Sequence, residues 1–560
     1  MVKKIFSFLN KEFHGVNEAA LLLGGFAFLS QILGLIRDKA FAHFVGAGPV
    51  LDVYYASFRI PDFLYISVAS LASVTVLMPF LMDRINKNKE DAKRFLNNVF
   101  SVFMMFMVFI SVLIAILMPY IAYLIAPGFS ESQLSLLITT SRIMLLSPIF
   151  IGLSNLIGTI TQLYKNFLIF SLSPIFYNIG ILFGVLVLYK KIGIHGLALG
   201  VILGAFMHLM VQVPIVVKYK FFPNFVKKIN WGEIWKVVQM SLPRTLALSA
   251  NSLAFMALIA MASTLKSGSI SLFTFAYNLQ SVPVGIIGIS YSVAAFPVLV
   301  KSFSLKDIDS FILHITSAAK QIIFWSFPII ALLIVLRAQI VRVILGSGAF
   351  SWADTRLTAA SVALFVISLI TQGLVLLLVR GYYAAGNTKK PVYVNVSSSI
   401  MIIVFAYSFI YIFKHYPYIL SNLESLLRVS GVPGTIMLAL PIAYALGSVL
   451  NFILIWFMFR KDFLKGKSFG IADTFMSSLV SALVMGVIAY LFLGIFANVF
   501  LTSTLLGILL QGLCSGIISI VFGVSVLYLL KNKELREIID TFKKKLHSNR
   551  VITAPEQGEL

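Results

Sequence analysis

Cysteine is almost absent from this 560-residue sequence, and its single copy, Cys514, lies inside an apolar run. An internal disulfide framework or a cysteine-based metal site needs more than one cysteine, so both are excluded. There is no GxxxxGK[ST] phosphate-binding loop, which indicates that the chain does not hydrolyse ATP itself. The acidic residues in the loops predicted to face outward, Glu131, Asp354 and Glu424, are scattered, and these loops contain no paired carboxylates, no Asp-x-Asp motif and no nucleophile elbow. We therefore expect no enzymatic activity, no metal and no cofactor.

Charged residues are also scarce. They make up 12% of the sequence, whereas hydrophobic residues make up 59% and the mean hydropathy is +0.96. No soluble core could hide that much apolar surface. The net charge of +23 comes mainly from basic residues between the apolar runs, a distribution that argues against nucleic acid as a partner. The composition predicts an all-α polytopic membrane protein.

Fourteen apolar runs are long enough to cross a membrane as helices. The predicted spans are residues 19–45, 50–82, 95–126, 134–162, 167–189, 193–217, 241–264, 270–300, 311–336, 356–379, 391–413, 434–459, 472–495 and 501–530. The N-terminal residues contain no short apolar stretch followed by a small-residue cleavage site, so we expect no removable signal peptide.

The distribution of Lys and Arg predicts the orientation. If the N-terminus is cytoplasmic, the segments on its side of the membrane carry 30 of these residues and the opposite segments carry 8. Positive loops stay on the cytoplasmic side. We therefore predict that both termini are cytoplasmic, which agrees with an even number of spans.

Short motifs recur six spans apart. PIFYN (174–178) opens the fifth span and PVYVN (391–395) the eleventh; MPFL (78–81) ends the second span and FPVL (296–299) the eighth. Such duplication is common in transporters. It predicts two six-helix lobes in a 6+6 repeat, followed by two further helices. The predicted parts are an N-terminal lobe (1–220), an interfacial linker helix (221–240), a C-terminal lobe (241–465), a final helix pair (466–530) and a cytoplasmic basic tail (531–560).

Several ionisable residues lie within or beside the first two spans. Arg37, Asp38 and Lys39 follow the first apolar run, and Asp52 and Arg59 are seven residues apart on one face of the second span. Charges in hydrocarbon are costly, which makes these residues candidates for function. Two interpretations stay open: ion pairs that hold helices together, or a hydrated cavity whose arginines bind an anionic headgroup.

Two arginines in later spans are further candidates. Arg142 lies in the fourth span, and Arg244 opens the seventh span directly after Pro243. Either a ligand role or, for Arg244, a role as an interfacial anchor fits these positions.

Motifs in the same order along most of the chain resemble the lipid II flippases of the multidrug/oligosaccharidyl-lipid/polysaccharide exporter superfamily. They are LGLIRD (33–38), FVGAG (44–48), ASFRIPD (56–62), SVPVG (281–285), GSGAF (346–350) and GYYAAGNTKKPV (381–392). The resemblance implies fourteen helices in two lobes around a cationic cavity, with the last two helices forming a groove for the polyprenyl tail. It also implies the substrate, undecaprenyl-pyrophosphate-linked disaccharide-pentapeptide, which is moved to the outer leaflet of the bacterial cytoplasmic membrane for peptidoglycan synthesis.

The resemblance assigns roles to some residues and also shows where charged residues of the family are absent from this sequence. Arg37 and Asp38 match a cavity arginine and its neighbouring acid, and Asp52 matches an acid of the second helix. The family usually has Arg at Gln31, an Arg pair at Tyr65-Ile66 and Asp-Arg at Tyr277-Asn278, so several cavity cations are missing here. The predicted substrate-binding residues are Arg37, Asp38, Lys39, Asp52, Arg59, Arg142, Arg244 and Asn278.

These features predict an alternating-access flippase in which Arg37, supported by Lys39 and Arg59, holds the pyrophosphate. Because family arginines are missing, a flippase for another polyprenyl-linked oligosaccharide stays open. A drug or cation antiporter would favour a cavity dominated by acids, and a non-transporting scaffold for cell-wall enzymes is a third alternative. The expected partners are the lipid-linked glycan and the bilayer, with cell-wall synthesis enzymes as further candidates.

Overall fold

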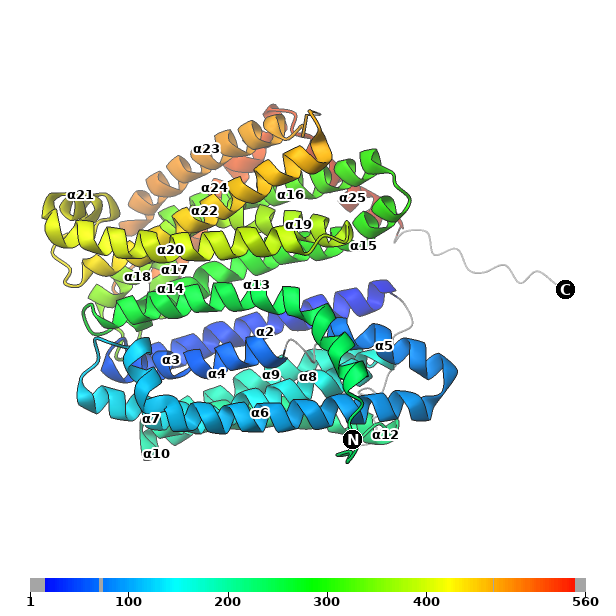
Figure 1. Cartoon of the computed structure of the whole chain (residues 1–560). Helices are drawn as coiled ribbons and strands as arrows, with labels where there is room; N and C mark the ends of the chain where they lie inside the picture. The colour runs from blue at the N-terminus through cyan, green and yellow to red at the C-terminus, as the bar shows by residue number, and fades with distance from the viewer. Residues whose placement is uncertain (1–15, 70–73, 467, 549–560) are drawn as a thin grey trace, which may run out of the picture. The chain divides into compact units, whose positions relative to one another are not determined.

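The structure is a computed structural model that describes residues 16–69, 74–466 and 468–548, and these residues form helices without any strand (Figure 1). The chain divides into two compact units. The first comprises residues 1–282, 344–365 and 387–451, and the second comprises 283–343, 366–386 and 452–560. Each unit is therefore assembled from separate stretches of the chain.

The first unit contains most of the N-terminal half of the chain. Its helices are α2 (Val16–Phe44), α3 (Pro49–Ser57), α4 (Arg59–Leu64), η1 (Tyr65–Ala69), α5 (Val74–Lys87), α6 (Lys89–Ile125), α7 (Glu131–Met144), α8 (Ser147–Leu163), α9 (Phe167–Phe183), η2 (Gly184–Leu188), α10 (Tyr189–Ile192), α11 (Ile194–Met210), α12 (Val213–Lys218), α13 (Trp231–Ser263), α14 (Ser269–Pro283), α18 (Trp352–Val366), α20 (Lys389–His415), α21 (Pro417–Leu427), η4 (Thr435–Leu438) and the first part of α22 (Ala439–Phe459). Within this unit α9 packs on α2 and α11, and α13 packs on α20.

The second unit begins at the π-helical turn η3. Its helices are η3 (Val284–Ile289), α15 (Ser290–Ser304), α16 (Ile308–Val335), α17 (Arg337–Ile344), α19 (Leu369–Ala384), the end of α22, η5 (Arg460–Leu464), α23 (Ala472–Ala497), α24 (Leu505–Leu529) and α25 (Lys533–Ser548). In this unit α23 packs on α16 and α24, and α15 packs on α16 and α19. The Tyr382 hydroxyl donates to Asp462 at 2.7 Å, which ties α19 to η5.

Ten helical segments in the described residues are long and apolar enough to cross a membrane, or eleven if the bent pair α18 and α19, which meet at 46°, forms one span. The three other predicted spans, 19–45, 50–82 and 241–264, contain residues that the structure does not describe in full. The count of fourteen therefore stays a prediction. The chain is an all-helical, multi-pass membrane protein.

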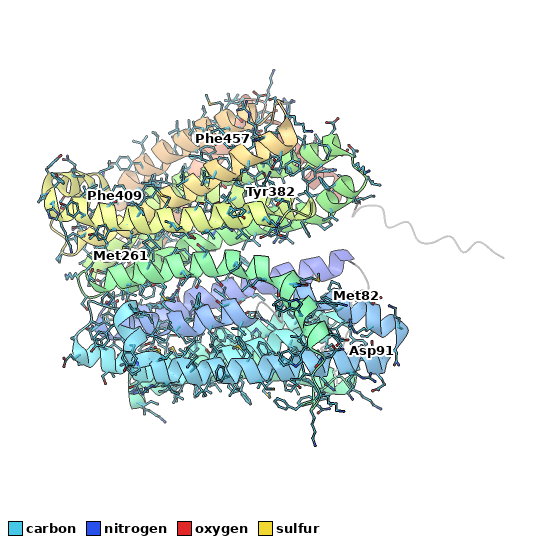
Figure 2. The ribbon with its side chains drawn as sticks, viewed as in Figure 1. Met82, Asp91, Met261, Tyr382, Phe409 and Phe457 are labelled. Atoms are coloured by element: carbon cyan, nitrogen blue, oxygen red, sulfur yellow. The ribbon has the colours of Figure 1, made fainter. Side chains whose placement is uncertain are left out.

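Large apolar side chains cover the outer faces of the helices. Tyr120 and Leu124 on α6 are 75% and 78% exposed, and Phe457 on α22, labelled in Figure 2, is 63% exposed. Soluble monomers rarely expose apolar patches of this extent. Lipid contact explains them.

Glycines allow α9 and η2 to approach α11 closely. A Cβ atom added to Gly180 would lie 2.2 Å from Gly204 Cα, and one added to Gly200 would lie 2.5 Å from Gly184 Cα. Gly180 and Gly184 are four residues apart, as are Gly200 and Gly204, so each pair lies on one helix face. Small residues are the usual means of close packing in membranes, where there is no hydrophobic force between helices.

Replacing Gly200 with Leu should therefore lower the stability of the first unit. The new side chain would meet backbone atoms, which cannot move aside without separating the helices, and overpacking of this kind costs about 3 kcal/mol. Thermal unfolding of the purified protein in detergent measures the loss. Gly494→Leu is the control because nothing lies within 4 Å of its Cβ position. Equal unfolding temperatures for the two variants would contradict the close packing.

The predicted interfacial linker is only partly a separate element. Residues 221–230 are not helical, and α13 begins at Trp231 and continues through the predicted seventh span to Ser263. Figure 1 shows that the first turns of α13 run at a steep angle to the rest. The amphipathic segment and the apolar segment are thus one bent helix.

Candidate functional site

A polar pocket in the first unit contains five charged or amide side chains, those of Gln31, Arg37, Asp38, Asn178 and Asn278. It has a volume of about 350 Å³ and is lined by α2, α9 and α14. Its polar lining residues are Ser30, Gln31, Arg37, Asp38, Asn178, Asn278 and Ser281. The first apolar helix, α2, thus continues past Arg37, Asp38 and Lys39 to Phe44, and the first two of these residues line the pocket.

Arg37 and Asp38 form an ion pair on the wall of this pocket. Arg37 donates from Nε and Nη2 to Asp38 Oδ1 at 3.1 and 2.9 Å. The Asp38 side chain is 4% exposed, whereas that of Arg37 is 24% exposed. The carboxylate is therefore sealed, and the guanidinium keeps an open face. The pair lies within α2 and borders a polar pocket, and the binding of an anionic headgroup there stays a prediction.

Two asparagines tie this pair to neighbouring helices. Asn278 Nδ2 on α14 donates to Asp38 Oδ2 at 2.9 Å. Arg37 Nη1 donates to Asn178 Oδ1 on α9 at 3.3 Å, and Asn178 donates in turn to Ser30 Oγ at 3.3 Å. Since these contacts occupy both oxygens of Asp38 and three of the five guanidinium N–H groups, the orientation of Arg37 is fixed.

Asp52 lies away from the pocket lining, at the start of α14. Its Oδ2 accepts from the Gly268 N–H at 2.6 Å, and its Oδ1 accepts from the Ser271 N–H and hydroxyl at 2.8 and 2.6 Å. Asp52 is 3% exposed. It supplies acceptors to orphan N–H groups at a helix N-terminus, where the macrodipole favours a carboxylate. Asp52 thereby fixes the helix that carries Asn278.

Arg59 lies on α4 beside an aromatic ring. Its Nε donates to the Tyr55 carbonyl at 3.2 Å, and its guanidinium carbon lies 4.8 Å from the centre of the Phe255 ring on α13. This is a cation–π distance. Lys39 lies on α2 and is half-buried. Neither residue is among those that line the polar pocket.

Arg142 on α7 compensates for a hydrogen bond that a proline removes from another helix, α6. Pro119 lies inside α6 and has no N–H for the Ala115 carbonyl, four residues earlier. Arg142 Nε on α7 donates to that carbonyl at 2.8 Å. Arg142 therefore stabilises the interruption in α6. The backbone of Arg244 belongs to α13, and its side chain lies outside what the structure describes.

The positions where family arginines are missing have separate surroundings. Gln31 lines the pocket next to Arg37. The Tyr65 hydroxyl, on η1, accepts from Asn155 Nδ2 at 2.8 Å. Gln31 therefore makes the pocket polar without adding a charge, and Arg37 supplies the positive charge of the lining.

Sequence analysis missed Ser30, Asn178 and Ser281 as site residues. A signal was present for Asn178, which ends the repeated PIFYN motif. Its counterpart Asn395 also accepts a polar contact, from Asn451 Nδ2 at 3.2 Å. No group of three His, Cys, Asp or Glu side chains that could hold a metal occurs in the described ranges.

The comparisons with known proteins point to one family. A family model described as "Lipid II flippase MurJ" matches residues 41–511. The chain is 28% identical over 407 residues to the probable lipid II flippase MurJ of Buchnera aphidicola subsp. Schizaphis graminum, covering 71% of this chain and 78% of the relative. It is 24% identical over 407 residues to the lipid II flippase MurJ of Burkholderia cenocepacia, covering 71% and 79%.

Solved structures are similar in fold. "Lipid II flippase MurJ, inward closed conformation" matches with a TM-score of 0.72 and 22% identity, over 93% of this chain and all of that chain. An inward-facing multidrug resistance MATE family transporter of the MOP superfamily matches with a TM-score of 0.61 and 15% identity, over 80% of this chain and all of that one. At these identities the likeness concerns the fold alone.

Proposed function

The chain belongs to the lipid II flippase family, and we propose that it moves lipid II, the undecaprenyl-pyrophosphate-linked peptidoglycan precursor, from the inner to the outer leaflet of the bacterial cytoplasmic membrane. A pyrophosphate does not cross hydrocarbon unaided, so it needs a polar, cationic path. The single observation that carries the proposal within this structure is the open guanidinium face of Arg37 in a polar pocket.

In the proposed mechanism Arg37 donates its remaining N–H groups to the pyrophosphate, because guanidinium binds phosphate oxygens through paired hydrogen bonds. Asp38, Asn178 and Asn278 are positioning residues that hold the guanidinium toward the pocket. Lys39 and Arg59 add positive charge on the neighbouring segments. The chain acts as a transporter and carries out no chemical conversion.

The other predicted site residues receive more distant roles. Asp52 holds the start of α14, and Arg142 holds the interruption in α6. Arg244 begins the apolar part of α13, where it acts as an interfacial anchor. Asp52 and Arg142 support the path of the headgroup through the helices that they fix.

The proposed transport cycle uses two six-helix lobes, residues 1–220 and 241–465, joined by the linker 221–240. One feature that supports this repeat is a π-helical turn in corresponding positions, η1 in the predicted second span and η3 in the predicted eighth. The lobes would rock in alternating access while the prenyl tail stays in lipid along the final helix pair, 466–530. The excess of basic residues supports two cytoplasmic termini.

A flippase for another polyprenyl-linked oligosaccharide is the second candidate, and the uncharged Gln31 in the pocket favours it. Both candidates need a cation for the pyrophosphate and differ in the sugar. The paired Arg37 and Asp38 argue against a cation antiporter, whose cavity would need unpaired acids. A scaffold for cell-wall enzymes would need no polar pocket.

Reconstitution of the purified protein tests the proposal. In vesicles that contain lipid II in one leaflet, we expect the headgroup to become accessible at the other face, at a rate well above that of empty vesicles. Restoration of growth in cells depleted of their own peptidoglycan flippase identifies lipid II over other lipid-linked glycans. No transport of any polyprenyl-linked sugar, with a folded protein, would contradict the proposal.

A further inference from the structure

A second pocket in the first unit is apolar and lies between α6 and the start of α13. It has a volume of about 560 Å³. Its wall on α6 includes Val99, Val102 and Phe103, and its wall on α13 includes Trp231, Trp235 and Val238. None of its lining residues is charged. We call it the α6–α13 groove.

The start of α13 presents an apolar stripe to this groove. Trp231, Ile234, Trp235 and Val238 have the spacing of one helical face. Trp231 and Trp235 line the groove and are still 64% and 61% exposed. Tryptophan in membrane proteins concentrates at the boundary between headgroups and hydrocarbon. These two rings therefore mark the depth at which lipid chains begin.

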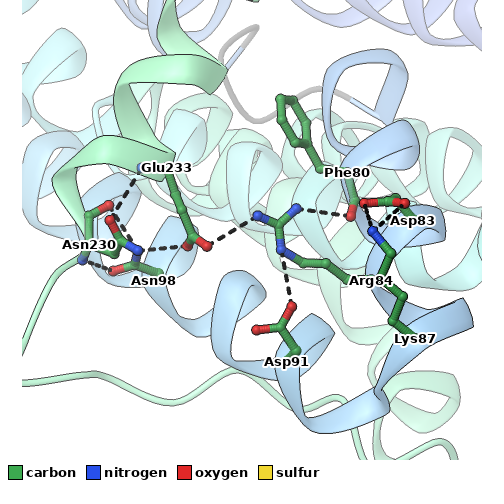
Figure 3. Close-up of polar contacts among 8 residues, drawn as sticks. All are labelled: Phe80, Asp83, Arg84, Lys87, Asp91, Asn98, Asn230 and Glu233. Carbon is green, nitrogen blue, oxygen red and sulfur yellow. Dashed lines mark hydrogen bonds and ion pairs between the residues drawn. The ribbon is translucent and has the colours of Figure 1, made fainter.

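A polar network at the start of α13 fixes the orientation of this helix (Figure 3). Arg84 Nη2 donates to Glu233 Oε1 at 3.1 Å, and the guanidinium carbon lies 4.3 Å from the centre of the Phe95 ring. Asn98 Oδ1 accepts from the Asn230 N–H at 3.0 Å. Because Glu233 is held toward α5 and α6, the helix cannot roll its apolar stripe away from the groove.

Exposed lysines flank the same segment. Lys227 and Lys228 precede α13, and Lys236 lies one residue after Trp235. Basic residues beside an apolar membrane-facing segment attract anionic headgroups. The groove thus combines a space for a chain, two interfacial tryptophans and positive charge next to them.

We propose that the α6–α13 groove binds one acyl chain of an anionic glycerophospholipid, with its phosphate near Lys227, Lys228 and Lys236. The groove volume of about 560 Å³ leaves room for part of one acyl chain. An undecaprenyl chain is far larger. The site is separate from the polar pocket, and the proposal does not depend on which substrate is transported.

Tryptophan fluorescence in nanodiscs tests this site. In the full-length protein with Trp325, Trp352 and Trp456 changed to Phe, Trp231 and Trp235 are the remaining reporters. Phosphatidylglycerol and phosphatidylcholine with brominated acyl chains are compared at equal mole fraction in a phosphatidylcholine bilayer. We expect the anionic lipid to quench at least threefold more strongly. Equal quenching by the two lipids would mean that the groove contacts the surrounding bilayer lipids without preference, and would overturn the proposal.

Matched variants separate a site from general surface charge. Lys227→Gln/Lys228→Gln/Lys236→Gln should remove the preference, whereas Lys301→Gln/Lys306→Gln/Lys461→Gln, which removes the same charge elsewhere, should keep it. If both triple variants lose it, or neither does, the proposal fails.

A second pair of variants tests whether the acyl chain lies in the groove. Val102→Phe fills the groove and should at least halve the preference for the anionic lipid. Val108→Phe should not, because Val108 lies outside the groove lining on α6 and its side chain is 44% exposed. Equal effects of these two variants overturn the proposal. Relief of quenching by unlabelled polyprenyl phosphate, without relief by unlabelled phosphatidylglycerol, would assign the groove to a prenyl chain and overturn it as well.

Discussion

Changing Arg37 to Gln and Asp38 to Asn together is expected to leave the protein folded and to lower headgroup translocation about 10- to 100-fold. The double change removes both charges of the pair and keeps amide groups that hydrogen-bond to each other and to Asn178 and Asn278. A hydrogen bond to a charged group contributes about 1.5–3 kcal/mol, which corresponds to that loss of rate if Arg37 binds the pyrophosphate. The vesicle assay for headgroup exposure gives the rate.

Single variants show why the double change is needed. Arg37→Gln alone leaves the 4% exposed Asp38 carboxylate without its cation, and breaking a buried pair from one side costs about 3–5 kcal/mol. Loss of flipping would then reflect unfolding. Arg37→Lys keeps the charge without the fork that reaches Asp38 and Asn178 together, and we expect an intermediate rate. Normal flipping by the double variant would assign the pair a purely structural role.

Asp52→Ala is expected to lower the free energy of unfolding by at least about 3 kcal/mol. The change leaves three buried donors at the start of α14 without an acceptor, namely the Gly268 N–H and the N–H and hydroxyl of Ser271. Each unsatisfied buried donor costs about 1–3 kcal/mol. Thermal unfolding in detergent measures the difference.

Two comparisons make this second result specific. Asp52→Asn keeps one acceptor oxygen and should lose less than the Ala variant. Asp354→Ala removes a carboxylate that accepts from Ser351 at the start of α18 in a more exposed position, and such caps contribute about 1 kcal/mol. If Asp52→Ala unfolded normally and yet failed to transport, Asp52 would act on the substrate directly.

Hydropathy predicted ten of the fourteen spans that the structure also has as apolar helices, because a helix that crosses lipid needs a long apolar run. It did not predict where they break. The run 50–82 contains α3, α4 and a π turn, and the run 356–379 is bent by 46° between α18 and α19. Such breaks depend on which carbonyls find other donors, and that is decided by neighbouring helices.

The residues that line the polar pocket were predicted only in part. The residue types of Arg37 and Asp38 identified them as costly in lipid, so they could be found from sequence. Asn178 is a neutral amide in an apolar helix, and only its place in a repeated motif distinguished it. Arg142 was equally conspicuous as a charge, but its contact depends on Pro119, 23 residues earlier in the chain on a different helix.

The pairing of Arg37 with Asp38 has an electrical consequence. The pair carries no net charge, so it does not cancel the charge of a bound pyrophosphate. In the proposed mechanism that negative charge travels outward, from the negative to the positive side of an energised membrane. The voltage then favours the step by roughly 2.3 kcal/mol per elementary charge and 100 mV. An imposed voltage should therefore speed the native protein without restoring the Arg37→Gln/Asp38→Asn variant, which lacks the group that holds the travelling charge.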